Sequence, residues 1–268
     1  MPEGHTIHRA AREHGKLLAG SVIRVSSPQG RFTDAGRVDG SVLESVEAYG
    51  KHLFYHWATG DIGHVHLGLF GKFRVTFGPE QIAPKGAVRM RLAGESDIGI
   101  VTVDLSGPTD CSVDAPPVRD KILARLGPDP LRRDADPQKM IDRVRRSDRG
   151  IGDLLMDQSV IAGVGNVYRA EALFVQGLHP LRPGSQCAPS ELQELWDTVQ
   201  KMLRKGVKDG RIVTVDRAEL GIARSKHIPR EDATYAYKRD QCLRCGREIS
   251  RIEIANRTCY YCPTDQPR

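Results

Sequence analysis

The sequence predicts an α+β protein with a β-rich N-terminal domain, a helical second domain and a short metal-binding module at its C-terminus. Apolar residues between positions 6 and 19 recur at helical spacing, and Gly20 ends the pattern. From about residue 21 to residue 105 the chain changes to short alternating runs, which Gly and Pro interrupt at roughly ten-residue intervals, as in a β-sandwich or barrel. After Pro116 and Pro117 helical spacing returns, and four of the six cysteines lie within residues 242–268.

The individual elements follow from these patterns. The alternating runs predict strands over residues 42–49, 53–57, 65–77, 88–92 and 98–105. In the second half Ser190 and Gln193 form a predicted capping box at the start of a helix, which carries Leu192, Leu195, Trp196, Val199, Met202 and Leu203 on one face. We therefore predict domains over residues 1–117 and 118–235, and a cysteine-rich module over residues 236–268.

Charge is divided unevenly between the two halves. Residues 1–118 hold 12 Lys and Arg against 13 Asp and Glu, whereas residues 119–268 hold 28 against 21, which gives net charges of −1 and +7. Such a basic half either meets a polyanion or is a solvated basic surface. No apolar run approaches the ~20 residues that span a bilayer, and the N-terminus lacks the features of a signal peptide. We expect a cytoplasmic protein that has no membrane partner.

The N-terminal Met1-Pro2-Glu3 could carry covalent chemistry. Removal of the initiator methionine would leave Pro2 with a secondary amine, and an α-amino group has a pKa of only about 7.7–8.0. Attack of this amine on a sugar C1′ would expel the base and leave an iminium, which acidifies the C2′ hydrogen and promotes loss of the 3′ phosphate. Glu3 adjoins the amine and could move protons to or from the sugar ring oxygen.

A second motif, Gly163-Val164-Gly165-Asn166, runs directly into a predicted helix. The N–H groups of a first helical turn, together with an Asn side chain, can bind a phosphate. The alternative interpretation is a plain tight turn between two helices.

The cysteines Cys242 and Cys245, then Cys259 and Cys262, have the spacing of paired zinc knuckles. A zinc ion would fold a segment that is too short to hold itself together. Arg257 lies between the knuckles and would project from the hairpin towards a phosphate. A redox-active Cys pair is the alternative.

Two further groups lie in the β-domain. Lys51 occupies a predicted turn between strands, and His64 and His66 share one strand face, where they could bind metal, pack, or contact phosphate. Leu69 and Phe70 lie between glycines, so this apolar pair is either buried in the core or serves as a wedge that enters a base stack.

Taken together, these motifs resemble the formamidopyrimidine-DNA glycosylase and endonuclease VIII family over essentially the whole chain. The resemblance is carried by Pro2-Glu3-Gly4, Gly50-Lys51, the Gly163 to Glu171 motif, the interdomain stretch 126–131 and the terminal cysteines. It implies a β-sandwich domain followed by a helix–two-turns–helix domain with a C-terminal zinc finger, one structural zinc ion, damaged DNA as the partner, a monomer, and association with the nucleoid.

The resemblance also implies residue roles. Pro2 would be the nucleophile, Glu3 the proton donor, and Lys51 a phosphate contact that assists the second elimination. Further expected DNA contacts are Asn166, Arg257, His66, Tyr168 and the wedge residues Leu69 and Phe70, with Glu171 as a supporting residue. The wedge pair is closer to the Leu-Tyr of the endonuclease VIII branch, which indicates oxidised pyrimidines as substrates.

We therefore expect a bifunctional DNA glycosylase and lyase that flips the damaged nucleotide and cuts the strand by β- and then δ-elimination. One alternative is an inactive zinc-finger protein that binds DNA damage on the same scaffold. Another is a metallohydrolase that uses His52, His56, His64 and His66.

The fourth zinc ligand is ambiguous in the sequence. Sixteen residues separate Cys245 from Cys262, which is the family's spacing, and this register makes Asp265 the fourth ligand. Thiolate chemistry favours Cys259 instead. However, residues 258–261 have the pattern of a strand, on which positions 259 and 262 face opposite ways, and Cys262-Pro263-Thr264-Asp265 has the turn that a knuckle requires. We favour Asp265, with Cys242, Cys245 and Cys262 as the other three ligands.

Overall fold

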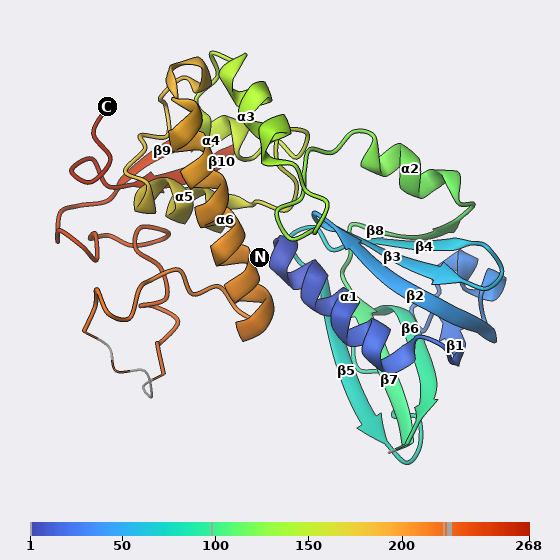
Figure 1. The fold of residues 1–268 in the computed structure, drawn as a ribbon. Coiled ribbons are helices and arrows are strands. Elements are labelled where there is room, and N and C mark those ends of the chain that lie inside the picture. The colour runs from blue at the N-terminus through green and yellow to red at the C-terminus, as the bar shows by residue number, and fades with distance from the viewer. Residues whose placement is uncertain (1, 98, 222, 224–226) are drawn as a thin grey trace. The chain divides into compact units, whose positions relative to one another are not determined.

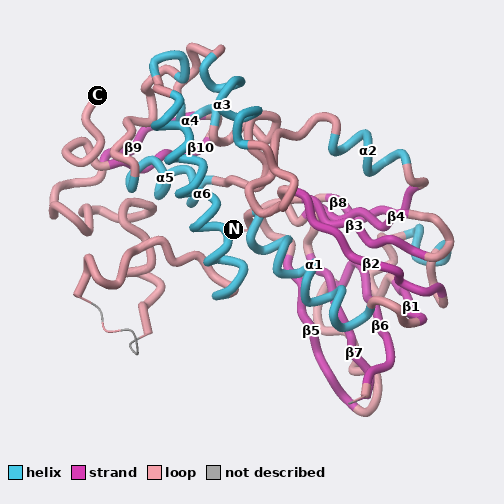
Figure 2. Tube along the Cα trace, in the orientation of Figure 1, coloured by secondary structure: helices cyan, strands magenta, loops and turns pink. Residues whose placement is uncertain are grey.

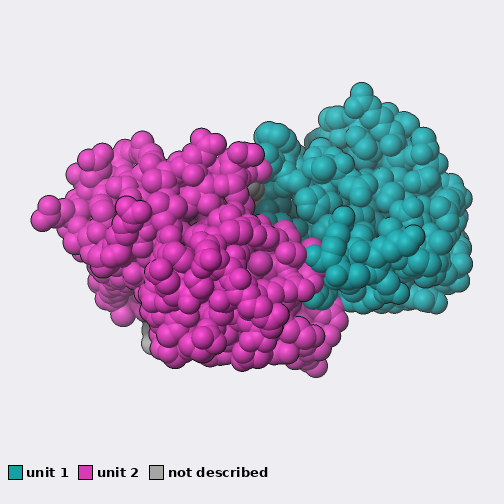
Figure 3. Space-filling view, turned by 90° about the horizontal axis from the view of Figure 1, so that it is seen from above, with its two compact units in different colours: residues 1–125 teal, residues 126–268 magenta. Residues whose placement is uncertain are grey.

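The structure is a computed structural model that describes every residue except 1, 98, 222 and 224–226. The chain divides into two compact units, residues 1–125 and 126–268 (Figure 3). Strands dominate the first unit and helices the second (Figure 2). Among the described residues, no helix has the length and apolar character needed to cross a membrane.

The first unit is a β-sandwich with one long helix, α1 (Gly4–Leu18), packed against it (Figure 1). The strands run in the order β5-β7-β6-β1-β2-β3-β4-β8. Strand β1 joins the two layers, because Val22 and Ile23 pair with β2 while residues 24–26 pair with β6. The strands are β1 (Val22–Ser26), β2 (Ser41–Tyr49), β3 (His52–Trp57), β4 (Ile62–His66), β5 (Lys72–Gly78), β6 (Val88–Ser96), β7 (Gly99–Ser106) and β8 (Asp110–Asp114), and helix α2 (Pro117–Leu123) follows them.

The predicted helix and β-domain are confirmed, with two differences in detail. The run predicted over residues 65–77 is two strands, β4 and β5, because the chain turns sharply at residues 67–71. Strand β8 had no alternating apolar signal, since Val113 is its only buried residue.

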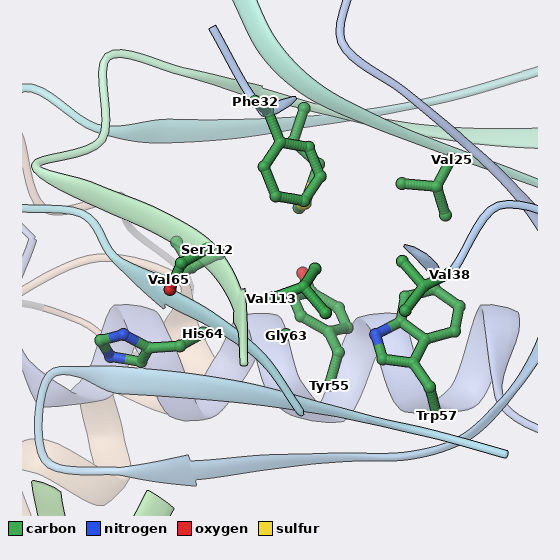
Figure 4. A pocket seen from close by; sticks show the side chains of 11 residues that line it. Val25, Phe32, Val38, Tyr55, Trp57, Gly63, His64, Val65, Ser112 and Val113 are labelled. Atoms are coloured by element: carbon green, nitrogen blue, oxygen red, sulfur yellow. The ribbon is translucent and has the colours of Figure 1, made fainter. Parts of the chain in front are cut away.

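The sandwich interior is closely packed. On β3, Leu53, Tyr55 and Trp57 face the core, and the residues between them face the other side of the sheet. A small pocket between the layers is lined mainly by apolar and aromatic side chains, among them Phe32, Tyr55 and Trp57 (Figure 4). It is part of the hydrophobic core, so we do not assign a substrate to it.

The second unit is helical and ends in a β-hairpin. Its helices are α3 (Pro137–Arg145), α4 (Ile151–Leu154), α5 (Asn166–Val175) and α6 (Pro189–Asp209), and its hairpin strands are β9 (Ser250–Ile254) and β10 (Arg257–Tyr261). The predicted apolar face of α6 is buried. The predicted capping box is wrong by two residues: Ala188 is the N-cap, and its N–H donates to the Glu191 carboxylate at 2.7 Å. The helix begins early because Pro189 fits its first turn.

Candidate functional site

The N-terminal motif lies at the start of α1. Glu3 is the N-cap residue and is fully buried, and its carbonyl accepts from the Thr6 N–H at 2.9 Å. Pro2 is half-buried beside it. His5 is also buried, and burial lowers its pKa to about 4. The motif therefore combines a buried acid, a neutral imidazole and the positive end of a helix dipole.

Lys51 lies in the tight turn between β2 and β3, as predicted, next to Gly50, whose φ of 57° suits glycine. The Lys51 side chain is half-buried. Its positive charge contributes to lowering the pKa values of His52 and His66. Lys51 therefore lies close to the histidines of β3 and β4.

Of the four histidines considered as metal ligands, three gather on one face of the sheet. The His52 ring centroid lies 5.2 Å from that of His64 and 5.0 Å from that of His66. His56 instead contacts the Glu47 carboxylate at 3.3 Å. Over the part of the chain that the structure describes, these histidines do not form a group that could hold a metal ion. His56 therefore lies apart from the other three histidines of the metallohydrolase alternative.

Leu69 and Phe70 form the tip of the turn between β4 and β5. Leu69 is 42% exposed and Phe70 is 84% exposed. Such a high exposure is unusual for an aromatic side chain. The turn closes with a Gly71 N–H to Leu67 carbonyl bond of 3.0 Å, and a Cβ at Gly71 would meet that carbonyl oxygen at 2.3 Å. The glycine is thus required to present the apolar pair.

The second motif begins helix α5 as predicted, with Gly165 at the N-cap. Asn166 is largely buried, because its amide donates to the Thr258 carbonyl at 3.0 Å and its oxygen accepts from Arg169. Arg169 also donates to the Ile254 carbonyl at 3.3 Å and the Arg257 carbonyl at 3.5 Å. These contacts bring Asn166 and Arg257 together, although Arg257 is 91 residues later in the chain.

The sequence does not single out Arg169, since an arginine in a helix ordinarily faces solvent. Here its side chain is fully buried. Tyr168 is fully buried as well and packs in the core of the second unit. The DNA contact predicted for Tyr168 stays a prediction.

Glu171 anchors a long irregular segment. Its carboxylate accepts from the backbone N–H groups of Tyr235, Ala236 and Tyr237 at 2.7–2.9 Å, and from the Thr214 hydroxyl. Burial raises the pKa of Glu171, while these four donors act in the opposite direction. The carboxylate fixes positions 214 and 235–237, so it holds both ends of the segment between them.

The cysteine module brings together four potential metal ligands. One ligand atom from each of Cys242, Cys245, Cys262 and Asp265 lies within 4.8 Å of the others. The backbone N–H of Asp265 donates to the Cys262 sulfur at 3.4 Å, which shows the turn expected of a knuckle. Cys259 is buried within β10 and is not part of this group. The structure thus places Asp265, not Cys259, beside the three cysteines.

The chain matches two protein-family models. The formamidopyrimidine-DNA glycosylase N-terminal domain covers residues 1–107, and the formamidopyrimidine-DNA glycosylase H2TH domain covers residues 126–217. Endonuclease 8 1 of Mycobacterium tuberculosis is 45% identical to this chain over an alignment of 276 positions, which covers 99% of this chain and 100% of the relative. The chain belongs to the formamidopyrimidine-DNA glycosylase and endonuclease 8 family. It is therefore a DNA glycosylase homologue of base excision repair, as the motifs predicted.

Other members of the family are more distant. The formamidopyrimidine-DNA glycosylase of Thermosynechococcus vestitus is 30% identical over 94% of this chain and 88% of its own length. The MutM (Fpg) structure of Thermus thermophilus matches with a TM-score of 0.78 and 26% identity, over 99% of this glycosylase and 98% of that chain. The structure of Lactococcus lactis Fpg non-covalently bound to DNA containing an AP site matches with a TM-score of 0.76 at 21% identity, over 99% and 100% of the two chains. These matches confirm the predicted fold class, and the identities place the chain nearer to the endonuclease 8 relatives.

Proposed function

We propose that this glycosylase removes oxidised bases from DNA and cleaves the strand with Pro2 as its nucleophile. The observation that carries the proposal is Pro2 beside the buried Glu3 at the N-terminus of α1. A helix N-terminus disfavours additional positive charge, which keeps an adjacent amine in its neutral, nucleophilic form at lower pH.

The chemistry is an amine substitution followed by two eliminations. The Pro2 nitrogen forms a bond to C1′, and the base leaves with the electron pair of its bond to C1′ and takes up the proton that the amine loses. Glu3 protonates the sugar ring oxygen as the ring opens to an iminium. Loss of a C2′ proton then expels the 3′ phosphate with the electron pair of its C–O bond. A second proton loss extends the conjugation and expels the 5′ phosphate.

The remaining residues bind and position the DNA in this proposal. Lys51 and His66 contact phosphate in the first unit, while Asn166 and Arg257 contact phosphate in the second. The exposed Leu69 and Phe70 enter the stack when the damaged nucleotide is flipped. The resemblance of this pair to the endonuclease VIII wedge favours oxidised pyrimidines. A single-turnover comparison should therefore show faster cleavage of thymine glycol than of 8-oxoguanine opposite cytosine, and the reverse order would contradict the preference.

The cysteine module holds one Zn²⁺ ion in this proposal. Three thiolates and one carboxylate are a donor set that suits tetrahedral zinc. The ion would act structurally, by stapling the irregular segment around Cys242 and Cys245 to the end of the β9–β10 hairpin. It would thereby support the hairpin that carries Arg257.

Borohydride trapping on abasic-site DNA tests the proposal. Reduction should join one protein to one oligonucleotide covalently. Pro2→Gly should trap weakly because it replaces the secondary amine with a primary one, and an added N-terminal extension should abolish trapping. Full trapping by the extended protein would overturn the role of Pro2, and DNA binding without any trapping would favour the inactive damage-binding alternative.

A further inference from the structure

Three polar side chains of β3, β4 and β8 are joined by hydrogen bonds in a chain. The Nδ1 atom of His64 lies 3.1 Å from the Asp110 Oδ2 atom, and the Nε2 atom of His64 lies 2.9 Å from the His52 Nδ1 atom. Both histidines are buried, whereas the Asp110 side chain is 51% exposed. This hydrogen-bond network therefore runs from the solvent-exposed Asp110 to the buried imidazole of His52.

The hydrogen bonds determine where the protons lie. A carboxylate only accepts, so His64 carries its ring proton on Nδ1 and accepts at Nε2. Burial lowers the pKa of His64, and burial together with its cationic neighbours lowers the pKa of His52 to about 3, so both rings are neutral at neutral pH. His52 must then donate from Nδ1, which leaves the lone pair of its Nε2 atom as an acceptor.

The far end of this hydrogen-bond network, at His52, lies beside His66 and close to two cations, Lys51 and Arg125. His52 pairs with His66 across β3 and β4, and their ring centroids are 5.0 Å apart. Lys51 directly precedes His52, and the charges of Lys51 and Arg125 both lower the pKa of His52. A neutral ring that accepts is compatible with these cations, whereas an N–H donor or an imidazolium at the same place would repel them.

We propose that Asp110 and His64 are positioning residues that hold His52 as a hydrogen-bond acceptor and so order Lys51 and His66 for binding phosphate. The inference rests on the proposed function for the phosphate-binding role of Lys51 and His66. The effect is analogous to the way a carboxylate fixes the tautomer of a catalytic histidine through the far ring nitrogen. Neither Asp110 nor His64 touches the DNA in this scheme.

The first test reads the tautomers directly. Ring nitrogen chemical shifts from ¹⁵N-edited NMR should place the proton of both His52 and His64 on Nδ1 in the unmodified protein. An Asn side chain can accept from one tautomer or donate to the other, so Asp110→Asn should populate both. Asp110→Glu keeps an acceptor and should restore the single tautomer. A single Nδ1–H tautomer that persists in Asp110→Asn would overturn the proposal.

Asp114→Asn is the matched control. Asp114 is on the same strand, and its charge also raises the pKa of His64, but its carboxylate accepts from the Ser112 hydroxyl at 2.7 Å. If charge alone set the tautomers, both Asn variants would change them, which would contradict a role for the hydrogen bond. We expect the tautomers to change in Asp110→Asn alone.

The second test uses strand cleavage of abasic-site DNA by His64→Phe, which fills the ring space that stacks on Phe54 and removes both hydrogen bonds. Loss of such an outer partner should raise KM roughly tenfold while the yield of borohydride trapping at saturating DNA stays unchanged. An unchanged KM in a variant with native circular dichroism would refute the positioning role. If the unmodified protein neither traps nor cleaves, the proposed function fails, whereas the NMR result still stands or falls by itself.

Discussion

The carboxylate of Glu171 accepts a hydrogen bond of 2.7 Å from the backbone N–H of Tyr235, 64 residues later in the chain. Two further N–H groups and the Thr214 hydroxyl complete its shell. A carboxylate can satisfy four donors, but an amide presents one oxygen and two N–H groups. Helix α5 therefore holds the segment after α6 through a carboxylate that accepts four hydrogen bonds, which a Gln amide cannot do.

Glu171→Gln should destabilise the second unit, because the N–H groups of the buried Gln amide would point at groups that are themselves hydrogen-bond donors. The expected loss is about 2–4 kcal/mol in the free energy of unfolding. Urea denaturation measures it, with the exposed Glu194→Gln on α6 as the control. Equal stability of the two variants would show that the four hydrogen bonds contribute little.

Stability should fall on acidification because of His14. This imidazole is buried, lies 2.8 Å from the Tyr55 hydroxyl, and has its pKa lowered by burial to about 4. Below about pH 6.5 the unfolded chain binds a proton that the folded protein does not, so stability that is present above pH 6.5 is lost towards pH 4.

The measurement is the unfolding free energy as a function of pH. His14→Gln cannot titrate, so between pH 6 and pH 5 its slope should be lower by about 1.4 kcal/mol per pH unit. Parallel curves for the variant and the unmodified protein would mean that His14 does not cause the acid sensitivity.

Zinc content should distinguish the two possible fourth ligands. Asp265→Ala should lose most of the metal and weaken DNA binding, since it removes a ligand from the Cys242, Cys245 and Cys262 cluster. Cys259→Ser changes a buried residue of β10 and should keep one zinc ion per chain. Metal analysis of both purified variants decides the matter, and the opposite pattern would assign four cysteines as ligands.

Lys51→Ala should uncouple the two eliminations. The first depends on the Pro2 iminium and should continue, whereas the second should slow, because a cation at the β2–β3 turn no longer stabilises the departing phosphate. The ends of the cleaved DNA strand, resolved by electrophoresis, should change from phosphate to unsaturated aldehyde. Ends that match those of the unmodified enzyme would remove Lys51 from this role.

Local sequence signals predicted the parts of the site that depend on neighbouring residues. The spacing of the cysteines predicted that Asp265 lies beside three of them, and the glycines on either side of Leu69 and Phe70 indicated a turn. Arg169 and the His52–His64 contact could not be predicted, because each depends on which strands pair or which hairpin packs on α5. The burial of Tyr168 could not be predicted either, because a motif gives the identity of a residue but not the direction of its side chain.

The most direct test of the central claim is the site of the covalent adduct. The complex trapped with borohydride on abasic-site DNA is digested and its peptides are analysed by mass spectrometry. We expect the sugar remnant on a peptide that begins at Pro2, with the initiator methionine absent and the modification on the proline nitrogen. An adduct on a lysine such as Lys51, or a trapped peptide that still carries Met1, would contradict the proposal that the N-terminal proline is the nucleophile.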